Sequence, residues 1–590
     1  MKCFIGVFVI EKSPIRLTRY FLPYRKDLIS TLLCGLITVG CNLMLPVFTR
    51  WIIDGLETET LTQPQLIWYL IYFFVVGAIS IFFSRYLRHF PMMLSHKVEY
   101  TLRNDVFQHL TQMDQAFYRS KRTGDLMTRL SSDINLVRDS IGQGFLQGVR
   151  TILVICMATS VMALADLQLA LIVVGLFTPM VIVFFLILRI MRRYQQELQE
   201  HVAEVSNYSQ ETFSGIRCIK GFALETRRNR AFEELNSDLI GKNMRVAASR
   251  HFLFSFMSFG FGLGTILIMV VGGKKVISGD LSLGTLTQFS AYLLYMQWPL
   301  LAISWVLSML QRGKVSWLRI KEILEREPTI QEKADLPIPG KCPEASIHFQ
   351  GVELKIDGRT FLQNINLDVP RGQTLGITGP TGSGKTLLTS LVARLSDPTA
   401  GSIEIGGIDL RDLPLSQLRG MIGYAAQEPM LFSKTLEHNI GFGLDELDAS
   451  TISWAADIAH LHHDVEGFPE KYETMLGERG VTLSGGQRQR TSISRAIARK
   501  PDILILDDVL ASVDTQTEAA IMSKLQPVMH NHTTLFVSHR ISTLRYADTL
   551  IVIEDGQITQ RGTHEELIQQ PGYYAELNTL QQLEQKLEAK

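Results

Sequence analysis

The stretch Gly379-Pro380-Thr381-Gly382-Ser383-Gly384-Lys385-Thr386 decides the fold of the second half of this 590-residue chain. It has the form G-x-x-x-x-G-K-T, a P-loop. Thr374 to Thr378 predict a buried strand before it, and apolar residues after it recur at helical spacing until Pro398. A glycine-rich turn that binds nothing would not explain both flanks. Because such a loop closes its N–H groups around phosphate oxygens, we expect it to bind ATP. Lys385 would then reach the terminal phosphates, and the Thr386 hydroxyl would be a ligand of Mg²⁺.

The composition indicates a protein that lies partly in a membrane. Hydrophobic residues make up 46% of the chain and charged residues 20%, and the mean hydropathy is +0.13. Lysine plus arginine equal aspartate plus glutamate at 58 each, so the net charge gives no reason to expect a nucleic-acid partner. The six cysteines form no C-x-x-C pair and are interpreted as small hydrophobic residues.

Six apolar segments in the first half are long enough to cross a hydrocarbon core of about 30 Å. They are Leu28–Ile53, Ile67–Phe90, Gly144–Ala165, Leu167–Ile190, Phe252–Val271 and Leu286–Leu310. An even number of spans places both termini on one side, and ATP places that side in the cytosol. Arg192 and Arg193 after the fourth span fit the positive-inside rule, whereas Lys274 and Lys275 in a predicted outer loop oppose it.

Two long charged loops, about Ser95–Ser140 and Arg192–His251, lie on the predicted inner side. Their polar–apolar pattern is helical, so we expect the membrane helices to continue into the cytosol; solvated charged hairpins are the alternative. We expect three parts: a transmembrane domain at residues 1–327 with six spans and two coupling loops, a linker at 328–345, and a nucleotide-binding domain at 346–590.

Two further motifs follow the P-loop. Ile503 to Leu506 form an apolar run that ends in Asp507, typical of a buried strand that delivers a carboxylate to magnesium. Leu483-Ser484-Gly485-Gly486-Gln487 precedes a helical stretch. With L-S-G-G-Q as its signature, the chain resembles the ATP-binding cassette family over essentially its whole length. Six spans ahead of one nucleotide-binding domain are similar to exporter half-transporters, most of all the multidrug-resistance-like ones that pair with a non-identical partner.

The resemblance implies the fold class and the roles of individual residues. The fold would be an α-helical transmembrane bundle of six helices with long cytosolic extensions, fused to an α/β P-loop nucleotide-binding domain. Gln427 would contact magnesium, His539 would lie near the terminal phosphate, and Asp514 would cross to the partner. Gly477-Glu478-Arg479-Gly480 would touch the coupling helices. Ser484, Gly485, Gly486 and Gln487 would close over the ATP that the partner's P-loop binds.

Two positions depart from the family pattern. Asp508 stands where most members have the glutamate that polarises the attacking water. Its carboxylate is withdrawn by about 1.5 Å, close to half a hydrogen-bond length, so we expect the site to bind ATP and to hydrolyse it poorly. The alternative is that a small backbone shift lets Asp508 work slowly. Ile356 stands where an aromatic ring usually stacks on adenine, and we expect it to hold the base less tightly.

These departures, with an intact signature, predict the degenerate-site half of a heterodimer whose partner carries the glutamate. The resemblance implies export of hydrophobic or amphipathic, multidrug-type substrates across a bacterial plasma (inner) membrane. Membrane lipids would surround the spans. A lipid flippase, a peptide exporter and a slow homodimeric ATPase share this architecture and stay open. The fused spans disfavour a soluble cassette ATPase and an importer.

Overall fold

The computed structural model describes residues 17–332, 344–477 and 480–588, which form two compact units. The first unit extends to residue 112 and continues from Lys121 to Glu327; the second comprises Met113–Ser120 and the chain from Pro328 onward. Met113–Ser120, which was expected in the first part, is grouped with the second. Residues 333–343 of the expected linker lie outside the described residues. So do residues 478–479 of the loop at 477–480.

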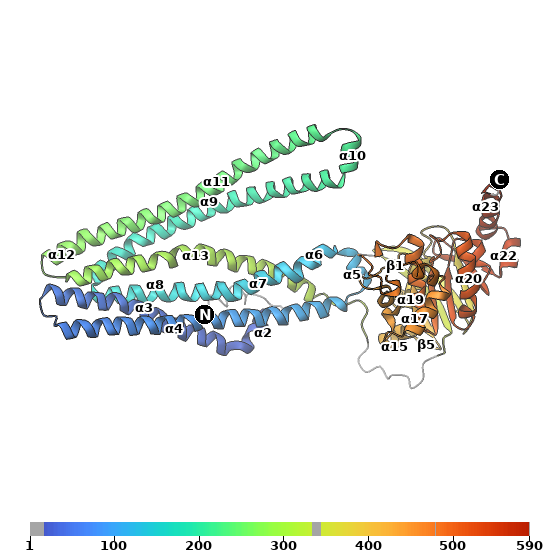
Figure 1. Ribbon diagram of the computed structural model, residues 1–590, viewed down its shortest axis with the longest axis horizontal. Helices are drawn as coiled ribbons and strands as arrows, with labels where there is room; N and C mark the ends of the chain where they lie inside the picture. The colour runs from blue at the N-terminus through green and yellow to red at the C-terminus, as the bar shows by residue number, and fades with distance from the viewer. Residues whose placement is uncertain (1–16, 333–343, 478–479, 589–590) are drawn as a thin grey trace. The chain divides into compact units, whose positions relative to one another are not determined.

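The first unit is entirely helical in its described residues (Figure 1). Its helices are α2 (Thr18–Phe21), α3 (Arg25–Glu57), α4 (Gln63–Thr111), α6 (Thr123–Thr128), α7 (Ile134–Asp139), α8 (Phe145–Ala165), α9 (Leu167–Ser214), α10 (Ile216–Gly221), α11 (Glu225–Leu267), α12 (Gly273–Ile277) and α13 (Leu283–Leu324). Four short segments join some of them: the 3₁₀ turn η1 (Leu22–Tyr24) and the π-helical segments η2 (Arg129–Asp133), η3 (Ser140–Gly144) and η4 (Ile268–Gly272). Six continuous helical stretches are long and apolar enough to cross a membrane, which confirms the expected six spans.

The long helices extend well beyond the apolar segments, as their polar–apolar pattern predicts. α9 and α11 form an antiparallel hairpin through α10 (Figure 1). Near its apolar end the two helices approach closely: a Cβ added at Gly260 of α11 would lie 1.9 Å from Cε of Met180 on α9. On α4, large apolar side chains such as Phe74 and Ile81 are about three-quarters exposed (75% and 74%), as expected for a surface that faces lipid.

Polar contacts fasten the ends of the helices where α8 meets α9 and where α12 leads to α13. Lys275 Nζ lies 2.6 Å from Asp166 Oδ2, so this lysine in the predicted outer loop is paired. Asp54 on α3 accepts hydrogen bonds from the Ser282 hydroxyl (2.9 Å) and the Gly284 N–H (2.8 Å). Arg50 lies 3.4 Å from the same carboxylate. These contacts explain how charged groups are accommodated at the ends of apolar helices.

The second unit contains two sheets. Their strands are β1 (Ile347–Ile356), β2 (Arg359–Val369), β3 (Thr374–Thr378), β4 (Ala400–Ile405), β5 (Ile408–Asp409), β6 (Ile422–Ala425), β7 (Ile503–Asp507), β8 (Thr533–Val537), β9 (Thr549–Glu554) and β10 (Gln557–Gly562). The smaller sheet is antiparallel, in the order β2-β1-β4-β5. The larger has the order β10-β9-β3-β8-β7-β6, with parallel pairing from β9 to β6. β3, β7 and β8 are buried along their whole length, as their apolar runs predict.

Helices surround these sheets and form a second apolar core beside them. They are α5 (Gln115–Ser120), α14 (Lys385–Val392), α15 (Leu415–Gly420), α16 (Leu436–Ile440), α17 (Ala449–Ile458), α18 (His462–Glu466), α19 (Gly485–Ala498), α20 (Thr515–His530), α21 (Ile541–Leu544), α22 (His564–Gln569) and α23 (Tyr573–Glu588), with the 3₁₀ turns η5 (Leu410–Asp412), η6 (Gly441–Gly443) and η7 (Lys471–Glu473).

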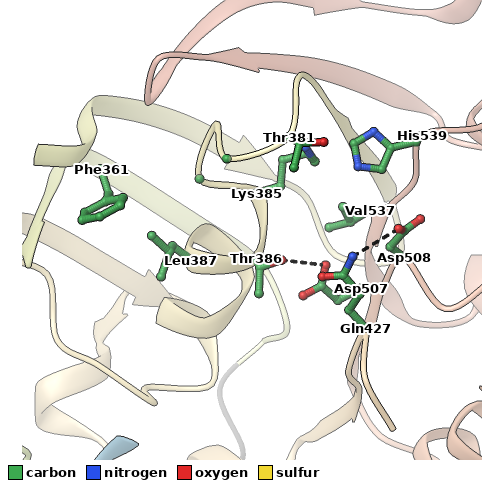
Figure 2. Close-up of a pocket in the computed structure, with 12 residues that line it drawn as sticks. Phe361, Thr381, Lys385, Thr386, Leu387, Gln427, Asp507, Asp508, Val537 and His539 are labelled. Atoms are coloured by element: carbon green, nitrogen blue, oxygen red, sulfur yellow. Dashed lines mark hydrogen bonds between the residues drawn. The ribbon is translucent and has the colours of Figure 1, made fainter. Parts of the chain in front are cut away.

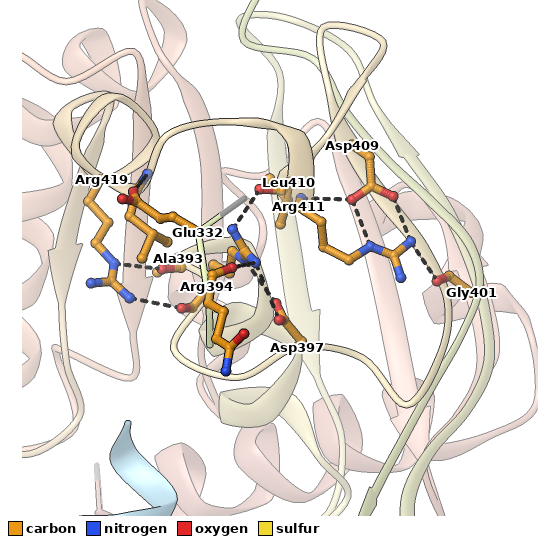
Figure 3. A network of polar contacts seen from close by, with 11 residues as sticks. Glu332, Ala393, Arg394, Asp397, Gly401, Asp409, Leu410, Arg411 and Arg419 are labelled. Atoms are coloured by element: carbon orange, nitrogen blue, oxygen red, sulfur yellow. Dashed lines mark hydrogen bonds and ion pairs between the residues drawn. The ribbon is translucent and has the colours of Figure 1, made fainter. Parts of the chain in front are cut away.

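A network around Arg394 fixes the first described residues of the linker to this unit (Figure 3). The Arg394 guanidinium donates to Asp397 Oδ1 (2.9 Å), to the Leu410 carbonyl (3.3 Å) and to the Gln331 carbonyl (3.3 Å). Glu332 Oε1 accepts from the Leu415 N–H at 2.6 Å. Because Arg394 is only 2% exposed, its charge depends on these partners, and they hold the chain in place just after Pro328.

Candidate nucleotide site

The predicted site residues meet where the parallel strands of the larger sheet end. The P-loop follows β3, Asp507 ends β7 and Asp508 follows it, His539 follows β8, and Gln427 follows β6. Carboxyl ends of parallel strands share one edge of a sheet, which is where open α/β sheets bind ligands. A cavity of about 220 Å³ lies at this edge (Figure 2). Its wall includes nine of the predicted residues: Thr381, Gly382, Gly384, Lys385, Thr386, Gln427, Asp507, Asp508 and His539.

The P-loop takes a backbone path in which three glycines, Gly379, Gly382 and Gly384, have a positive φ. Gly379 has φ 143°, and a Cβ there would lie 2.0 Å from the Ile553 carbonyl oxygen. Gly384, at φ 105°, immediately precedes α14. The Lys385 ammonium donates to the carbonyls of Gly379 (2.8 Å) and Pro380 (2.7 Å). Because an ammonium has three donors, one remains for a phosphate oxygen. Burial lowers the pKa of Lys385, while the nearby Asp508 and Asp507 raise it.

Thr386 and Asp507 offer the oxygen atoms that magnesium prefers. The Thr386 hydroxyl donates to Asp507 Oδ1 at 3.2 Å (Figure 2). Asp507 Oδ2 is buried and has no hydrogen-bond partner among the described residues. A buried carboxylate oxygen left without a partner is costly, and a divalent cation held by oxygen ligands would remove that cost. Burial and the neighbouring Asp508 charge together raise the pKa of Asp507 to about 6, against the opposing effects of the Thr386 hydrogen bond and the Lys385 charge. The residues present therefore fit Mg²⁺.

Asp508 occupies a strained turn directly after β7. Its φ is 49°, a left-handed conformation that aspartate adopts more readily than longer side chains. Its N–H donates to the Val537 carbonyl at 3.0 Å, which fixes the turn against β8. Its Oδ2 accepts from Gln427 Nε2 at 3.5 Å (Figure 2). The carboxylate is thus tethered at the cavity wall by backbone on one side and an amide on the other.

His539 also faces the cavity, and sequence reasoning missed the residue that fixes its backbone. Gln581 on α23 donates from Nε2 to the His539 carbonyl (2.7 Å) and accepts from the Ile541 N–H (2.9 Å). Burial lowers the pKa of His539, as does the Lys385 charge, while Asp508 opposes both effects. A neutral imidazole is therefore favoured. No motif near the end of the chain marks Gln581, because its role depends on where α23 packs.

The residue that the sequence alignment placed against adenine is not the one that lines the cavity in the structure. Ile356 ends β1 and packs against the apolar core, so its side chain is used for packing. Phe361 on β2 lines the cavity instead, with Leu387 beside it (Figure 2). The two strands form a hairpin in which Ile356 pairs with Arg359, and this turn brings Phe361 to the cavity. Ile356, which was expected in the nucleotide site, therefore does not line this cavity.

The signature residues Ser484, Gly485, Gly486 and Gln487 begin α19, and none of them lines this cavity. Ser484 and Gln487 form a reciprocal capping pair at 3.2 and 3.0 Å. Gln487 Nε2 also donates to Asp464 Oδ1 at 3.0 Å, so Asp464 holds the signature in place.

Asp514, expected to reach a partner, caps α20 by accepting from the Gln516 and Thr517 N–H groups. In the expected contact loop, Gly477 and Gly480 are described, whereas Glu478 and Arg479 lie outside the described residues.

Comparison with known proteins identifies both halves. A family model described as the ABC transporter transmembrane region matches residues 28–300, and one described as ABC transporter matches residues 362–511. The chain is 34% identical over 542 residues to the probable multidrug resistance ABC transporter ATP-binding/permease protein YheI of Bacillus subtilis, with 90% of this chain and 91% of that one covered. It is 33% identical over 552 residues to the multidrug resistance-like ATP-binding protein MdlA of Escherichia coli, with 93% of each covered.

Among solved structures, a bacterial Atm1-family ABC exporter with ATP bound matches with a TM-score of 0.78 and 23% identity, covering 94% of this chain and 98% of that one. This likeness concerns the fold. Together with the family matches and the P-loop geometry, it identifies the chain as a member of the ABC transporter family, an exporter half-transporter whose six membrane-capable helices precede an ATP-hydrolysing nucleotide-binding domain.

Proposed function

We propose that this chain is the degenerate-site half of a heterodimeric exporter that drives hydrophobic or amphipathic molecules out of a bacterial cell. The relatives named for multidrug resistance support this substrate class. The nucleotide-binding domain and both termini would be cytoplasmic, and the membrane would be the plasma (inner) membrane. The second half would be a non-identical half-transporter with the catalytic glutamate that this chain lacks.

The site residues divide the work on ATP. The P-loop N–H groups and Lys385 bind the phosphates, and Phe361 offers an aromatic face to the adenine. Thr386 and Asp507, with Gln427 nearby, would hold Mg²⁺, which would supply positive charge to the transferring phosphate oxygens. His539 donates toward the terminal phosphate, and Asp508 accepts a proton from the attacking water. The partner's signature would close the site from the other side.

Asp508 is the observation that carries the proposal. Its carboxylate is one methylene shorter than a glutamate would be, and its backbone is fixed by the bond from its N–H to Val537. A displacement near 1 Å typically costs about 10² in rate. Because the fixed turn resists the backbone shift that would compensate, this site would bind ATP and turn it over slowly. The complete signature beginning α19 would meanwhile serve the partner's site.

The decisive experiment measures ATP turnover by this chain alone and together with a candidate partner, a half-transporter that carries the catalytic glutamate. We expect low turnover alone and high turnover for the pair. Asp508→Glu should raise the turnover of the chain alone by about 10². Asp508→Asn is the matched control, because it keeps the length and removes the base. Changing the partner's catalytic glutamate to glutamine should silence the pair.

Brisk hydrolysis by the wild-type chain as a homodimer would contradict the degenerate site. So would a pair that stays active when the partner's glutamate is replaced. Vectorial transport into inside-out vesicles, assayed with a dye, a lipid analogue and a peptide, decides among multidrug export, lipid flipping and peptide export.

A further inference from the structure

The first unit holds a second, larger cavity of about 940 Å³ between α8, α9, α11 and α13. This volume is at the upper end of the range for ligand pockets, about 300–1,000 Å³. One part of its wall is apolar and aromatic, with Leu188, Leu253, Phe254, Trp298, Leu301 and Trp305. The rest is polar and includes three arginines, Arg192, Arg250 and Arg312. The wall of the cavity therefore has an apolar, aromatic region and a polar region with three positive charges.

The connectivity places all three arginines toward one end of the helices. Arg192 follows Leu188 on α9, and Arg312 follows Trp298 and Trp305 on α13. α11 runs antiparallel to α9 because α10 joins them, and α13 returns alongside α11 through the short turn after α12 (Figure 1). Arg250, which precedes Phe254 on α11, therefore lies toward the same end. From Trp298 to Arg312 the helix advances about 21 Å at 1.5 Å per residue.

These arginines have no compensating carboxylate in the described part of the chain. No aspartate or glutamate lines the cavity, and no acidic group lies within ion-pair distance of Arg192, Arg250 or Arg312 among the described residues. Arg312 donates to the neutral Ser308 hydroxyl at 2.7 Å. By contrast Arg193, next to Arg192 but outside the cavity wall, lies 3.1 Å from Glu197. The three guanidinium groups that line the cavity therefore have no carboxylate partner among the described residues.

We propose that this cavity binds an amphipathic anion, with an acidic head group on the arginines and an apolar or aromatic body against Trp298, Trp305 and Phe254. The inference rests on the proposed export function and names its substrate class. Guanidinium groups bind carboxylate, sulfate and phosphate through charge-assisted, often bidentate hydrogen bonds. Three positive charges with no carboxylate partner among the described residues disfavour a cationic amphipath, since like charges repel. The cavity thus selects charge sign at one end and accepts varied apolar shapes at the other.

The test uses the purified full-length protein in phosphatidylcholine nanodiscs with a tryptophan-free scaffold, without ATP. Tryptophan fluorescence is titrated with octyl phosphate, octyl sulfate, octyl glucoside and octyltrimethylammonium, each below its micelle concentration. We expect the two anions to bind about tenfold or more tightly than the neutral and cationic probes. Inorganic phosphate alone should bind weakly, because it lacks the body that meets the tryptophans. Trp298→Phe/Trp305→Phe should remove most of the signal.

Arginine variants assign the selectivity to these residues. Arg192→Gln, Arg250→Gln and Arg312→Gln should each weaken octyl phosphate binding about five- to tenfold, with octyl glucoside unchanged. Arg193→Gln is the matched control and should bind like the wild type. Arg312→Glu should shift the preference toward octyltrimethylammonium. Retained octyl glucoside binding shows that each variant is folded.

Equal or tighter binding of octyltrimethylammonium by the wild type would overturn the inference, as would anion binding that the glutamine variants leave unchanged. Adding phosphatidylglycerol to the nanodiscs separates two sources of the same chemistry: competition with octyl phosphate indicates a lipid head group, and its absence indicates a soluble amphipath. Since binding is measured without ATP, its outcome is independent of the turnover experiments that test the half-transporter proposal.

Discussion

The nucleotide cavity and the arginine-lined cavity of the helical unit recognise anions by different means. In the first, consecutive residues from Gly379 to Thr386 shape a loop whose backbone N–H groups and single lysine face the ligand. In the second, isolated side chains from α8, α9, α11 and α13 converge, and the backbone donors are all used within helices. A site formed by backbone N–H groups tolerates little change in its ligand. A site formed by separate side chains can accept many different ligands.

The largest expected effect breaks the first site and leaves the second intact. Lys385→Ala removes the ammonium that lies against the Gly379 and Pro380 carbonyls. Because hydrogen bonds to a charged group contribute about 1.5–3 kcal/mol each, ATP affinity should fall about 100-fold. Isothermal titration with ATP and magnesium measures the loss. Octyl phosphate binding in the nanodisc assay should not change, and a parallel loss there would show that the variant is misfolded.

A second prediction breaks the apolar part of the arginine-lined cavity. Trp298→Ala/Trp305→Ala removes two exposed rings, each contributing about 1 kcal/mol of aromatic contact to a bound body, so octyl phosphate should bind about 30-fold more weakly. Since the fluorescence signal is lost with the rings, radiolabelled octyl phosphate measures the affinity. Trp51→Ala, which alters an exposed tryptophan outside the cavity, should leave binding unchanged. ATP affinity measured by calorimetry should be unaffected in both variants.

A third prediction distinguishes the roles of two neighbouring apolar residues, Phe361 in ATP binding and Ile356 in core packing. Phe361→Ala should weaken ATP binding about tenfold, because stacking of a base on an aromatic ring contributes about 1–3 kcal/mol. Ile356→Ala should leave ATP affinity unchanged and lower the free energy of unfolding by about 1–2 kcal/mol, since Ile356 is only partly buried against the core. Calorimetry and thermal unfolding distinguish them. The reverse pattern would restore Ile356 to the site.

The smallest expected effect concerns the residue that fixes His539. Gln581→Leu removes both hydrogen bonds to the segment after β8, so His539 should be less well positioned. Turnover by this chain's own site, measured in the Asp508→Glu chain alone, should fall about threefold, as for one lost neutral hydrogen bond, with ATP affinity unchanged. Gln582→Leu is the matched control, because its amide contacts only Asn578 on the same helix. A drop in ATP affinity in place of turnover would contradict a positioning role.

The parts that sequence predicted share a physical property: they are specified by contiguous residues. The P-loop, the strand ending at Asp507 and the six apolar helices each have a local pattern, and the structure has these elements at the expected places. Ile356 was expected at the adenine in place of Phe361, which was considered out of register; bulges in the β1–β2 pairing change which side chain faces the site. Gln581 and the three cavity arginines carry no local signal at all. Arg192 satisfied the positive-inside rule, and only the packing of α9 against its neighbours shows that it also lines a cavity.

One contact in the second unit has a consequence for communication along the nucleotide-binding domain. Gln489, 5% exposed on α19, accepts through Oε1 from the Ser512 N–H at 3.0 Å. Ser512 lies four residues after Asp508. The hydrogen bond therefore links the segment that follows Asp508 to α19, the helix that begins with the signature. A movement of the turn at Asp508 that accompanies ATP hydrolysis would therefore also move the start of α19. The ATP at this chain's P-loop and the ATP that its signature covers would therefore not be hydrolysed independently of each other.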